Sequence, residues 1–174
     1  MIINDSLLRA QARLGMVRPF LESNVQGSSI DLTLGSHIKV EAPVGTGIDW
    51  FDTDITADPY DLQPGEFILA HTAETITVPP DCGAMVLLRS SAARAGFEHS
   101  LAGWCDPGFS GQITLELRNN LRFRSLKVEA GMRICQLVVH QLKQPATQQY
   151  GERGSYQGQL GATASNNNFK REAA

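Results

Sequence analysis

Residues 102–117 read AGWCDPGFSGQITLEL and join a tight turn to an alternating strand. The turn is Asp106-Pro107-Gly108, because proline fixes φ and glycine tolerates a positive φ. Successive side chains of a strand point to opposite faces. The apolar face, which we expect in the core, carries Ile113, Leu115 and Leu117. The polar face carries Gln112, Thr114 and Glu116.

Glu116 is the residue of this strand with the clearest chemical potential. A carboxylate on a rigid strand is well placed for general acid/base catalysis. A glutamate on the polar face of a strand is also often no more than a solvated charge. The pattern alone leaves both interpretations open.

Strand patterns recur along most of the chain. They occupy residues 30–34, 38–40, 67–70, 75–78, 85–88 and 134–139, with turn-forming residues between many of them. Residues 42–65 hold three prolines and five aspartates, and we interpret them as a long loop or an excursion from the body of the domain. The first ~20 residues read as a helix that Asn4, Asp5 or Ser6 caps and Gly15 ends. This predicts a mainly β fold: an antiparallel sandwich, jelly roll or distorted barrel with a short N-terminal helix.

Composition bounds the class of protein. The chain has 174 residues, 42% of them hydrophobic and 19% charged, which suits one globular domain. Its formal net charge of −3 argues against non-specific binding of nucleic acid. No apolar run approaches the ~18 residues of a membrane-spanning helix, and the N-terminus lacks a secretory pattern. We therefore expect a cytoplasmic protein without a nucleic-acid or membrane partner.

Cysteines and histidines give no metal-binding pattern. Cys82, Cys105 and Cys135 are odd in number and widely spaced, so we expect buried thiols rather than disulfides. The histidines are His37, His71, His99 and His140, and none forms a ligand pair with another. The HExxH motif and the zinc-deaminase signature are absent. The sequence predicts no zinc site and no metal held by protein ligands.

A second chemical motif is the segment RSSAARAG at residues 89–96. Ser90 or Ser91 can cap a short helical turn that Gly96 ends. Free amides, two hydroxyls and two arginines would form an oxyanion cradle. A capped surface helix with two solvated arginines explains the same residues equally well.

Several motifs together resemble one family. They are RSSxxRxG at 89–96, AGxxDPGFxGxITLE at 102–116, GMxIxQL at 131–137, SIDLxLG at 29–35, and Tyr150 followed by YxxQxG at 156–161. In this order and nearly this spacing they resemble the dCTP deaminases of the dUTPase-like superfamily. The resemblance covers roughly residues 1–165. We therefore expect a domain of this type over residues 1–164. Residues 165–174 are polar and show no periodicity, which predicts a flexible tail.

The resemblance also implies an activity. Members are homotrimers of distorted β-barrel or jelly-roll subunits, with active sites between neighbours, and they deaminate dCTP hydrolytically without zinc. Mg²⁺ arrives on the substrate triphosphate, dUTP is a possible further substrate, and dTTP is a possible inhibitor. A catalytically inactive regulatory trimer is the alternative from a different class. The presence of Ser90, Arg94, Asp106 and Glu116 together argues against it.

The family pattern assigns roles to individual residues. Glu116 would be the general acid/base, Ser90 and the carbonyl of Ala102 would hold the attacking water, and Arg94 would orient Ser90. Substrate contacts would come from Arg89, Ser91, Asp106, Thr114, Leu115, Gln136, Tyr150 and Gln159. Asp106 would contact the sugar hydroxyl, and the backbone at Thr114 and Leu115 would contact the base. The C-terminal segment would act as a lid.

The product of the reaction is the open point. Ser155 stands where relatives carry a phosphate-binding lysine, Leu101 replaces a threonine, and the segment at 97–101 is one residue short. A looser grip on the phosphates should hurt phosphate hydrolysis more than attack at C4. We therefore expect dUTP as the product. The alternatives are a bifunctional enzyme that forms dUMP and diphosphate, or a dUTPase.

Overall fold

The fold is built from antiparallel strands in three sheets. The computed structural model describes residues 1–45, 47–100 and 102–166. One sheet has six strands: β4(Gly47–Asp54), β3(His37–Val44), β6(Phe67–Thr77), β10(Ser110–Asn119) and β8(Phe97–His99) in this order, with β1(Val17–Arg18) also paired to β6. A second sheet has the order β2(Ile30–Thr33), β12(Arg133–Gln141), β7(Cys82–Leu88), β9(Trp104–Cys105). The third pairs β11(Leu126–Val128) with β5(Tyr60–Leu62).

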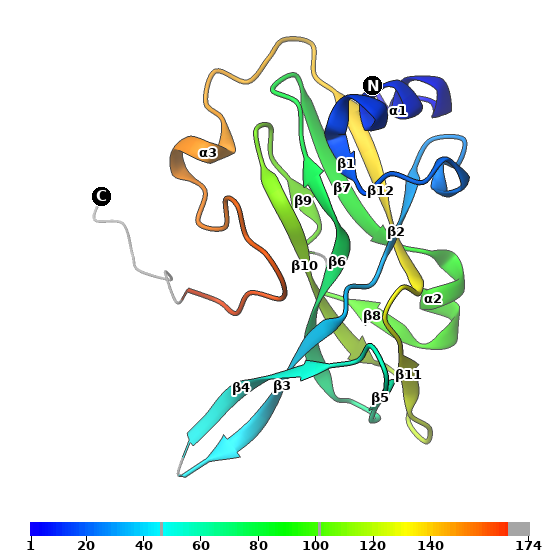
Figure 1. Ribbon diagram of the computed structural model, residues 1–174, viewed down its shortest axis with the longest axis vertical. Helices are drawn as coiled ribbons and strands as arrows, with labels where there is room; N and C mark the ends of the chain where they lie inside the picture. Colours follow the sequence, from blue (N-terminus) through cyan, green and yellow to red (C-terminus); the bar gives the residue numbers. More distant parts are fainter. Residues whose placement is uncertain (46, 101, 167–174) are drawn as a thin grey trace.

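The helices are short and peripheral (Figure 1). They are α1(Asp5–Gln11), a π-helical turn over Ala12–Met16, a 3₁₀ turn over Glu22–Asn24, α2(Ser90–Ala95) and α3(Tyr150–Arg153). The side chain of Asn4 caps α1 by accepting a hydrogen bond from the backbone N–H of Leu7 at 3.2 Å. Gly15, at φ 105°, takes the left-handed conformation that ends the helical segment. The expected N-terminal helix is confirmed, although it is shorter than 20 residues.

The core lies between the two larger sheets. Strand β10 buries the alternate residues Ile113, Leu115 and Leu117, as predicted, and leaves Gln112, Thr114 and Glu116 half-exposed. Strand β6 buries Ile68, Ala70 and Ile76, while β12 buries Cys135, Leu137 and Val139. All three cysteines are buried free thiols, as expected. The mainly β prediction is confirmed, and the described strands form stacked sheets rather than a closed barrel.

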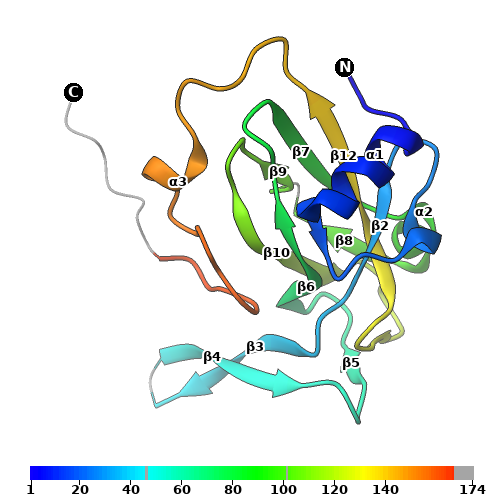
Figure 2. The same ribbon diagram turned by 45° about the horizontal axis from the view of Figure 1, so that its top comes forward.

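Two sequence-based assignments need correction. The patterns at 67–70 and 75–78 belong to one long strand, β6, because nothing in residues 71–74 turns the chain. Residues 42–65 are an excursion rather than a loop: they contain the end of β3, all of β4 and β5. Strands β3 and β4 pair from His37↔Asp54 to Val44↔Gly47 and project from the body as an arm (Figures 1 and 2). Strand β4 reads GIDWFDTD, so the apolar Trp50 and Phe51 are adjacent and the strand lacks the alternation that marks a half-buried strand.

None of the described helices combines the length and the apolar character that crossing a membrane requires.

Candidate active site

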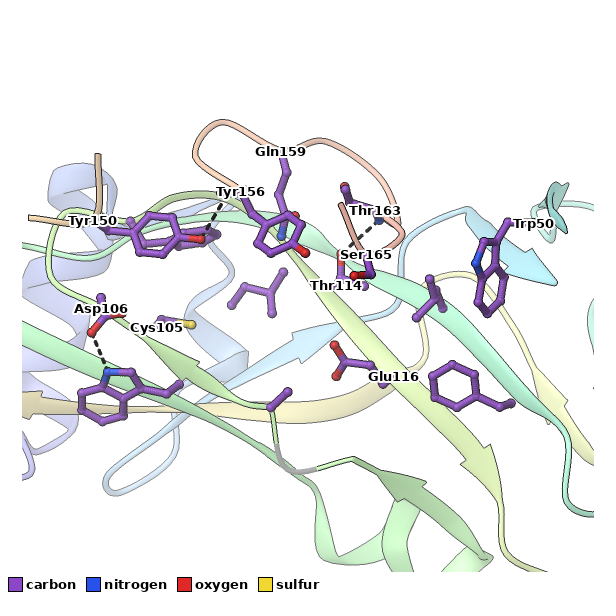
Figure 3. Close-up of a pocket in the computed structure, with 16 residues that line it drawn as sticks. Trp50, Cys105, Asp106, Thr114, Glu116, Tyr150, Tyr156, Gln159, Thr163 and Ser165 are labelled. Carbon is purple, nitrogen blue, oxygen red and sulfur yellow. Dashed lines mark hydrogen bonds between the residues drawn. The ribbon is translucent and has the colours of Figure 1, made fainter. Parts of the chain in front are cut away.

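A cavity of about 420 Å³ lies over the polar face of β10, where Glu116 is found (Figure 3). Its walls are the outward face of β6 and β10, the turn after β9, the arm and the C-terminal segment. Its lining residues are Trp50, Phe67, Leu69, Ala102, Trp104, Cys105, Asp106, Phe109, Ile113, Thr114, Glu116, Tyr150, Tyr156, Gln159, Thr163 and Ser165. Six of the predicted site residues meet here: Ala102, Asp106, Thr114, Glu116, Tyr150 and Gln159.

The carboxyl group of Glu116 lies beside the ring of His99. Oε2 of Glu116 is 3.6 Å from Nε2 of His99, and neither atom has a hydrogen-bond partner among the described residues. This separation is longer than a hydrogen bond. Burial raises the pKa of Glu116 and lowers the pKa of His99, so both groups are pushed toward their neutral forms. A carboxyl group with a raised pKa can both accept and return a proton near neutral pH.

The buried carboxyl of Glu116 also has a cost in stability. Below its ordinary pKa of 4.5, folded and unfolded chains both carry the proton and the cost is absent. It grows as pH rises through the raised pKa of the folded chain. We therefore expect Glu116→Gln to raise the free energy of unfolding at neutral pH but not below pH 4.5. Thermal unfolding at both pH values tests this, since each kcal/mol shifts Tm by about 2–4 °C. A variant less stable than the wild type at neutral pH would contradict it.

The turn that carries Asp106 is fixed by Trp104. The indole Nε1–H of Trp104 donates a hydrogen bond of 2.8 Å to Oδ1 of Asp106. A Cβ at Gly103 would lie 2.3 Å from the carbonyl oxygen of Val86, and the backbone N–H of Val86 donates to the carbonyl of Gly103 at 2.7 Å. Glycine at this position therefore lets β7 and the segment after Ala102 approach closely. This close approach places Ala102 and Asp106 on the cavity wall.

The C-terminal segment covers the other side of the cavity. The backbone N–H of Gln112 donates to the carbonyl of Gln159 at 2.9 Å, and Nε2 of Gln159 donates to the carbonyl of Gln112 at 2.7 Å. The backbone N–H of Thr163 donates to Oγ1 of Thr114 at 3.1 Å. Ser165, which we expect to begin the tail, lines the cavity. The rest of the predicted tail, residues 167–174, lies outside the described residues.

The other predicted site residues lie elsewhere in the chain. Arg89, Ser90, Ser91 and Arg94 are on or next to α2, and Gln136 is on β12. Nε of Arg89 is 3.3 Å from Oδ1 of the buried Asp31, and Oγ of Ser29 donates to Oε1 of Gln136 at 3.0 Å. None of these five residues lines the cavity in the described part of the chain. The side chain of Leu115 is buried in the core, so only its backbone could contact a ligand.

The predicted cap of α2 is wrong. Arg89 occupies the N-cap position and makes no capping hydrogen bond with its side chain, while Ser90 and Ser91 are the first two helical residues. Helix α2 itself and its end at Gly96, at φ 114°, are as predicted.

Several cavity residues were missed by the sequence analysis. Trp50 lies in a segment interpreted as loop, so nothing marked it. Phe67 begins a continuous apolar run with Ile68 and Leu69. Such a run has no alternation, so it does not show which side chain faces outward. Tyr156 is part of the C-terminal motif. His99 is not part of the lining but lies beside Glu116, and the sequence indicates only its failure to form a metal-ligand pair. Within the described ranges, no group of three or more His, Cys, Asp or Glu side chains is placed to bind a metal ion.

Comparisons with known proteins agree on one family. A sequence model of the family described as dCTP deaminase-like matches residues 2–142. A relative from Streptomyces coelicolor named "dCTP deaminase, dUMP-forming" is 40% identical over 189 residues, covering 98% of both chains. One of the same name from Aquifex aeolicus is 39% identical over 175 residues, covering 95% of this chain and 94% of its own.

Among solved structures, 2'-deoxycytidine 5'-triphosphate deaminase from Agrobacterium tumefaciens matches with a TM-score of 0.66 and 20% identity. The match covers 79% of this chain and 47% of that one. At this level of identity, the likeness shows the shared fold.

Proposed function

The chain belongs to the dCTP deaminase-like family, and from this premise we propose that it converts dCTP to dUMP, diphosphate and ammonia. The observation that carries the proposal is the buried carboxyl of Glu116 in a cavity that also holds Asp106 and the docked C-terminal segment. In the reaction two waters are consumed: one replaces the amino group at C4, and the other cleaves the bond between the α- and β-phosphates.

Deamination would depend on proton transfer through Glu116. Its carboxylate takes a proton from water as the oxygen attacks C4 of cytosine, and it then delivers a proton toward the departing nitrogen. The C4–N4 bond breaks, ammonia leaves, and N3 of the uracil ring carries a proton. His99 lies 3.6 Å from the carboxyl and, in its neutral form, limits how the carboxyl can turn. Asp106, oriented by Trp104, would accept a hydrogen bond from the sugar hydroxyl.

The triphosphate site would be completed by a second subunit. Arg89, Ser90, Ser91 and Arg94 lie away from the cavity of their own chain, and α2 is on a different face from the C-terminal segment (Figure 1). In a homotrimer α2 of one subunit would enter the cavity of its neighbour, bringing Ser90 to the attacking water and the arginines to the Mg²⁺-bound triphosphate. We include the homotrimer in the proposal for this reason.

The choice of dUMP over dUTP revises the expectation from the sequence. The relatives from Streptomyces coelicolor and Aquifex aeolicus, which match nearly the whole chain, both carry the dUMP-forming name. Ser155 and Leu101 are the residues from which dUTP was expected as the product. Ser155 is exposed and is not part of the cavity lining in the described chain, so its lack of charge removes nothing from that lining. Leu101 lies outside the described residues.

Product analysis decides between the two outcomes. We expect a dCTP reaction with Mg²⁺, stopped early, to contain dUMP and diphosphate from the first time point, without free dUTP. The sharper form uses labelled dCTP with excess unlabelled dUTP: the label should reach dUMP without appearing in dUTP. Labelled dUTP that accumulates would make the enzyme a dUTP-forming deaminase. Hydrolysis of dUTP without action on dCTP would make it a dUTPase.

A further inference from the structure

The cavity continues past Glu116 into an apolar end that the deamination of dCTP does not require. Trp50, Phe67 and Leu69 form this end. The rings of Trp50 and Phe67 meet edge to face, with centroids 6.2 Å apart and planes at 63°. Figure 3 shows Trp50 on one side of Glu116, and Asp106 with Tyr150 on the other.

Strand pairing explains why these side chains share one face of the sheet. Leu69 on β6 lies directly opposite Glu116 on β10, and Phe67 comes two residues before Leu69 in β6, on the same face. Strand β3 pairs with β6 at Lys39↔Leu69, and β4 places Trp50 opposite Glu41 on β3. The arm thus delivers Trp50 beside Phe67, one row beyond the row of Glu116.

The course of β10 fixes the order in which Asp106, Glu116 and the apolar end follow one another along the cavity. The turn with Asp106 precedes the start of β10, Glu116 lies further along the strand, and Phe67 pairs with Arg118 beyond it. Under the proposed function the sugar lies at Asp106 and C4 lies at Glu116. Cytosine carries its sugar on N1 and its amino group on C4, at opposite ends of the ring. The exocyclic N4 therefore points toward Trp50 and Phe67, whereas a substituent on C5 points sideways.

We propose that this apolar end receives a substituent on the leaving nitrogen, so that the enzyme also hydrolyses N4-alkylated dCTP, with N4-methyl-dCTP as the simplest case. Water adds to C4, the C4–N4 bond breaks, and the amine nitrogen takes one proton through Glu116 while N3 takes the other. The products of this step are methylamine and the uracil nucleotide, with no change in oxidation state. The inference rests on the proposed function, because it takes the position of the base from it.

The test supplies dCTP, N4-methyl-dCTP and 5-methyl-dCTP to the wild-type protein with Mg²⁺. Ion chromatography measures ammonia and methylamine, and liquid chromatography measures the nucleotides. We expect methylamine in an amount equal to the uracil nucleotide formed, with kcat/KM for N4-methyl-dCTP within about tenfold of that for dCTP. We also expect N4-methyl-dCTP to be hydrolysed faster than 5-methyl-dCTP.

A pair of variants on the arm localises the effect. Trp50→Ala removes an apolar contact to the methyl group, so the ratio of kcat/KM for N4-methyl-dCTP to that for dCTP should fall about fourfold, the equivalent of ~0.8 kcal/mol per buried methyl. Phe51→Ala is the matched control, because Phe51 is the next residue of β4 and is 46% exposed. Its ratio should equal that of the wild type.

The failures of the two proposals are distinguishable. Turnover of dCTP without release of methylamine from N4-methyl-dCTP would overturn the inference and leave the proposed function intact; a neighbouring subunit that fills the apolar end would produce this result. Faster hydrolysis of 5-methyl-dCTP than of N4-methyl-dCTP would place the free space beside C5 and would also overturn it. Absence of turnover with dCTP would overturn the proposed function and the inference together.

Discussion

Glu116→Gln is expected to reduce the release of ammonia from dCTP by at least about a thousandfold, because an amide can neither take a proton from water nor return one to the departing nitrogen. Nucleotide binding should survive, since glutamine has the shape of glutamate and the other cavity residues are unchanged. The structure adds a second expectation that separates this loss from damage to the fold. The variant should be more stable than the wild type at neutral pH, because it no longer buries an ionisable carboxyl.

The measurement combines ammonia release, calorimetric binding of dCTP and thermal unfolding on the same preparation. Glu129→Gln is the matched control, because Glu129 is an exposed glutamate in the turn after β11 and lies outside the cavity lining in the described chain. Its turnover should equal that of the wild type. Substantial turnover by Glu116→Gln would remove Glu116 from the role of general acid/base. Loss of turnover together with loss of binding would mean that Glu116 acts in holding the substrate.

The parts of the fold that could be predicted are those in which burial imposes a pattern. Strand β10 has one face in the core and one toward the cavity, so its residues alternate and both faces were assigned correctly. The arm of β3 and β4 is largely exposed, and its second strand, β4, places the apolar Trp50 and Phe51 side by side. Without a buried face to impose alternation, β4 leaves no period of two in the sequence. The prolines and aspartates of the arm then looked like loop chemistry.

The residues of the candidate site also fall into those that a local pattern predicts and those that it does not. Asp106, Thr114 and Glu116 are close in sequence and reach the cavity through one turn and one strand, so a local motif was sufficient to find them. Trp50 and Phe67 reach the cavity through the pairing of β4, β3 and β6. Local sequence patterns do not show which strands pair, so they could not identify these two residues. The partner of Glu116 was missed for a related reason. His99 is brought to it by the pairing of β8 with β10, at Leu117↔His99.

The predicted site residues fall into two groups that lie apart in the single chain, and this separation bears on the oligomeric state. Glu116 and Asp106 line the cavity, whereas Ser90 and Arg94 are on α2, outside the lining in the described residues. If all four act in one reaction, one subunit must supply the first pair and a neighbour the second. A site of this kind can be rebuilt from two defective chains, because each defect lies on a different side of the interface.

Co-expression of Glu116→Gln and Arg94→Ala chains is therefore expected to restore activity that neither variant has alone. Arg94 is exposed in the single chain, so its replacement should leave the subunit fold intact. In a randomly mixed trimer, a site is complete when its glutamate comes from an Arg94→Ala chain and its arginine from a Glu116→Gln chain. Every trimer that contains both variants, in either ratio, has one such complete site among its three sites, so we expect the purified mixed trimers to have about a third of wild-type activity.

Two different tags allow the mixed trimers to be purified before ammonia release is measured. The control replaces the Arg94→Ala chain by one that carries both substitutions, which leaves every glutamate absent and should restore nothing. If each site lies within one chain, the mixed trimers will be as inactive as the single variants, and α2 will have no role across the interface. High activity of Arg94→Ala by itself would show instead that Arg94 is not needed. Recovery near a third requires both that α2 enters the neighbouring cavity and that Glu116 and Arg94 act on the same substrate.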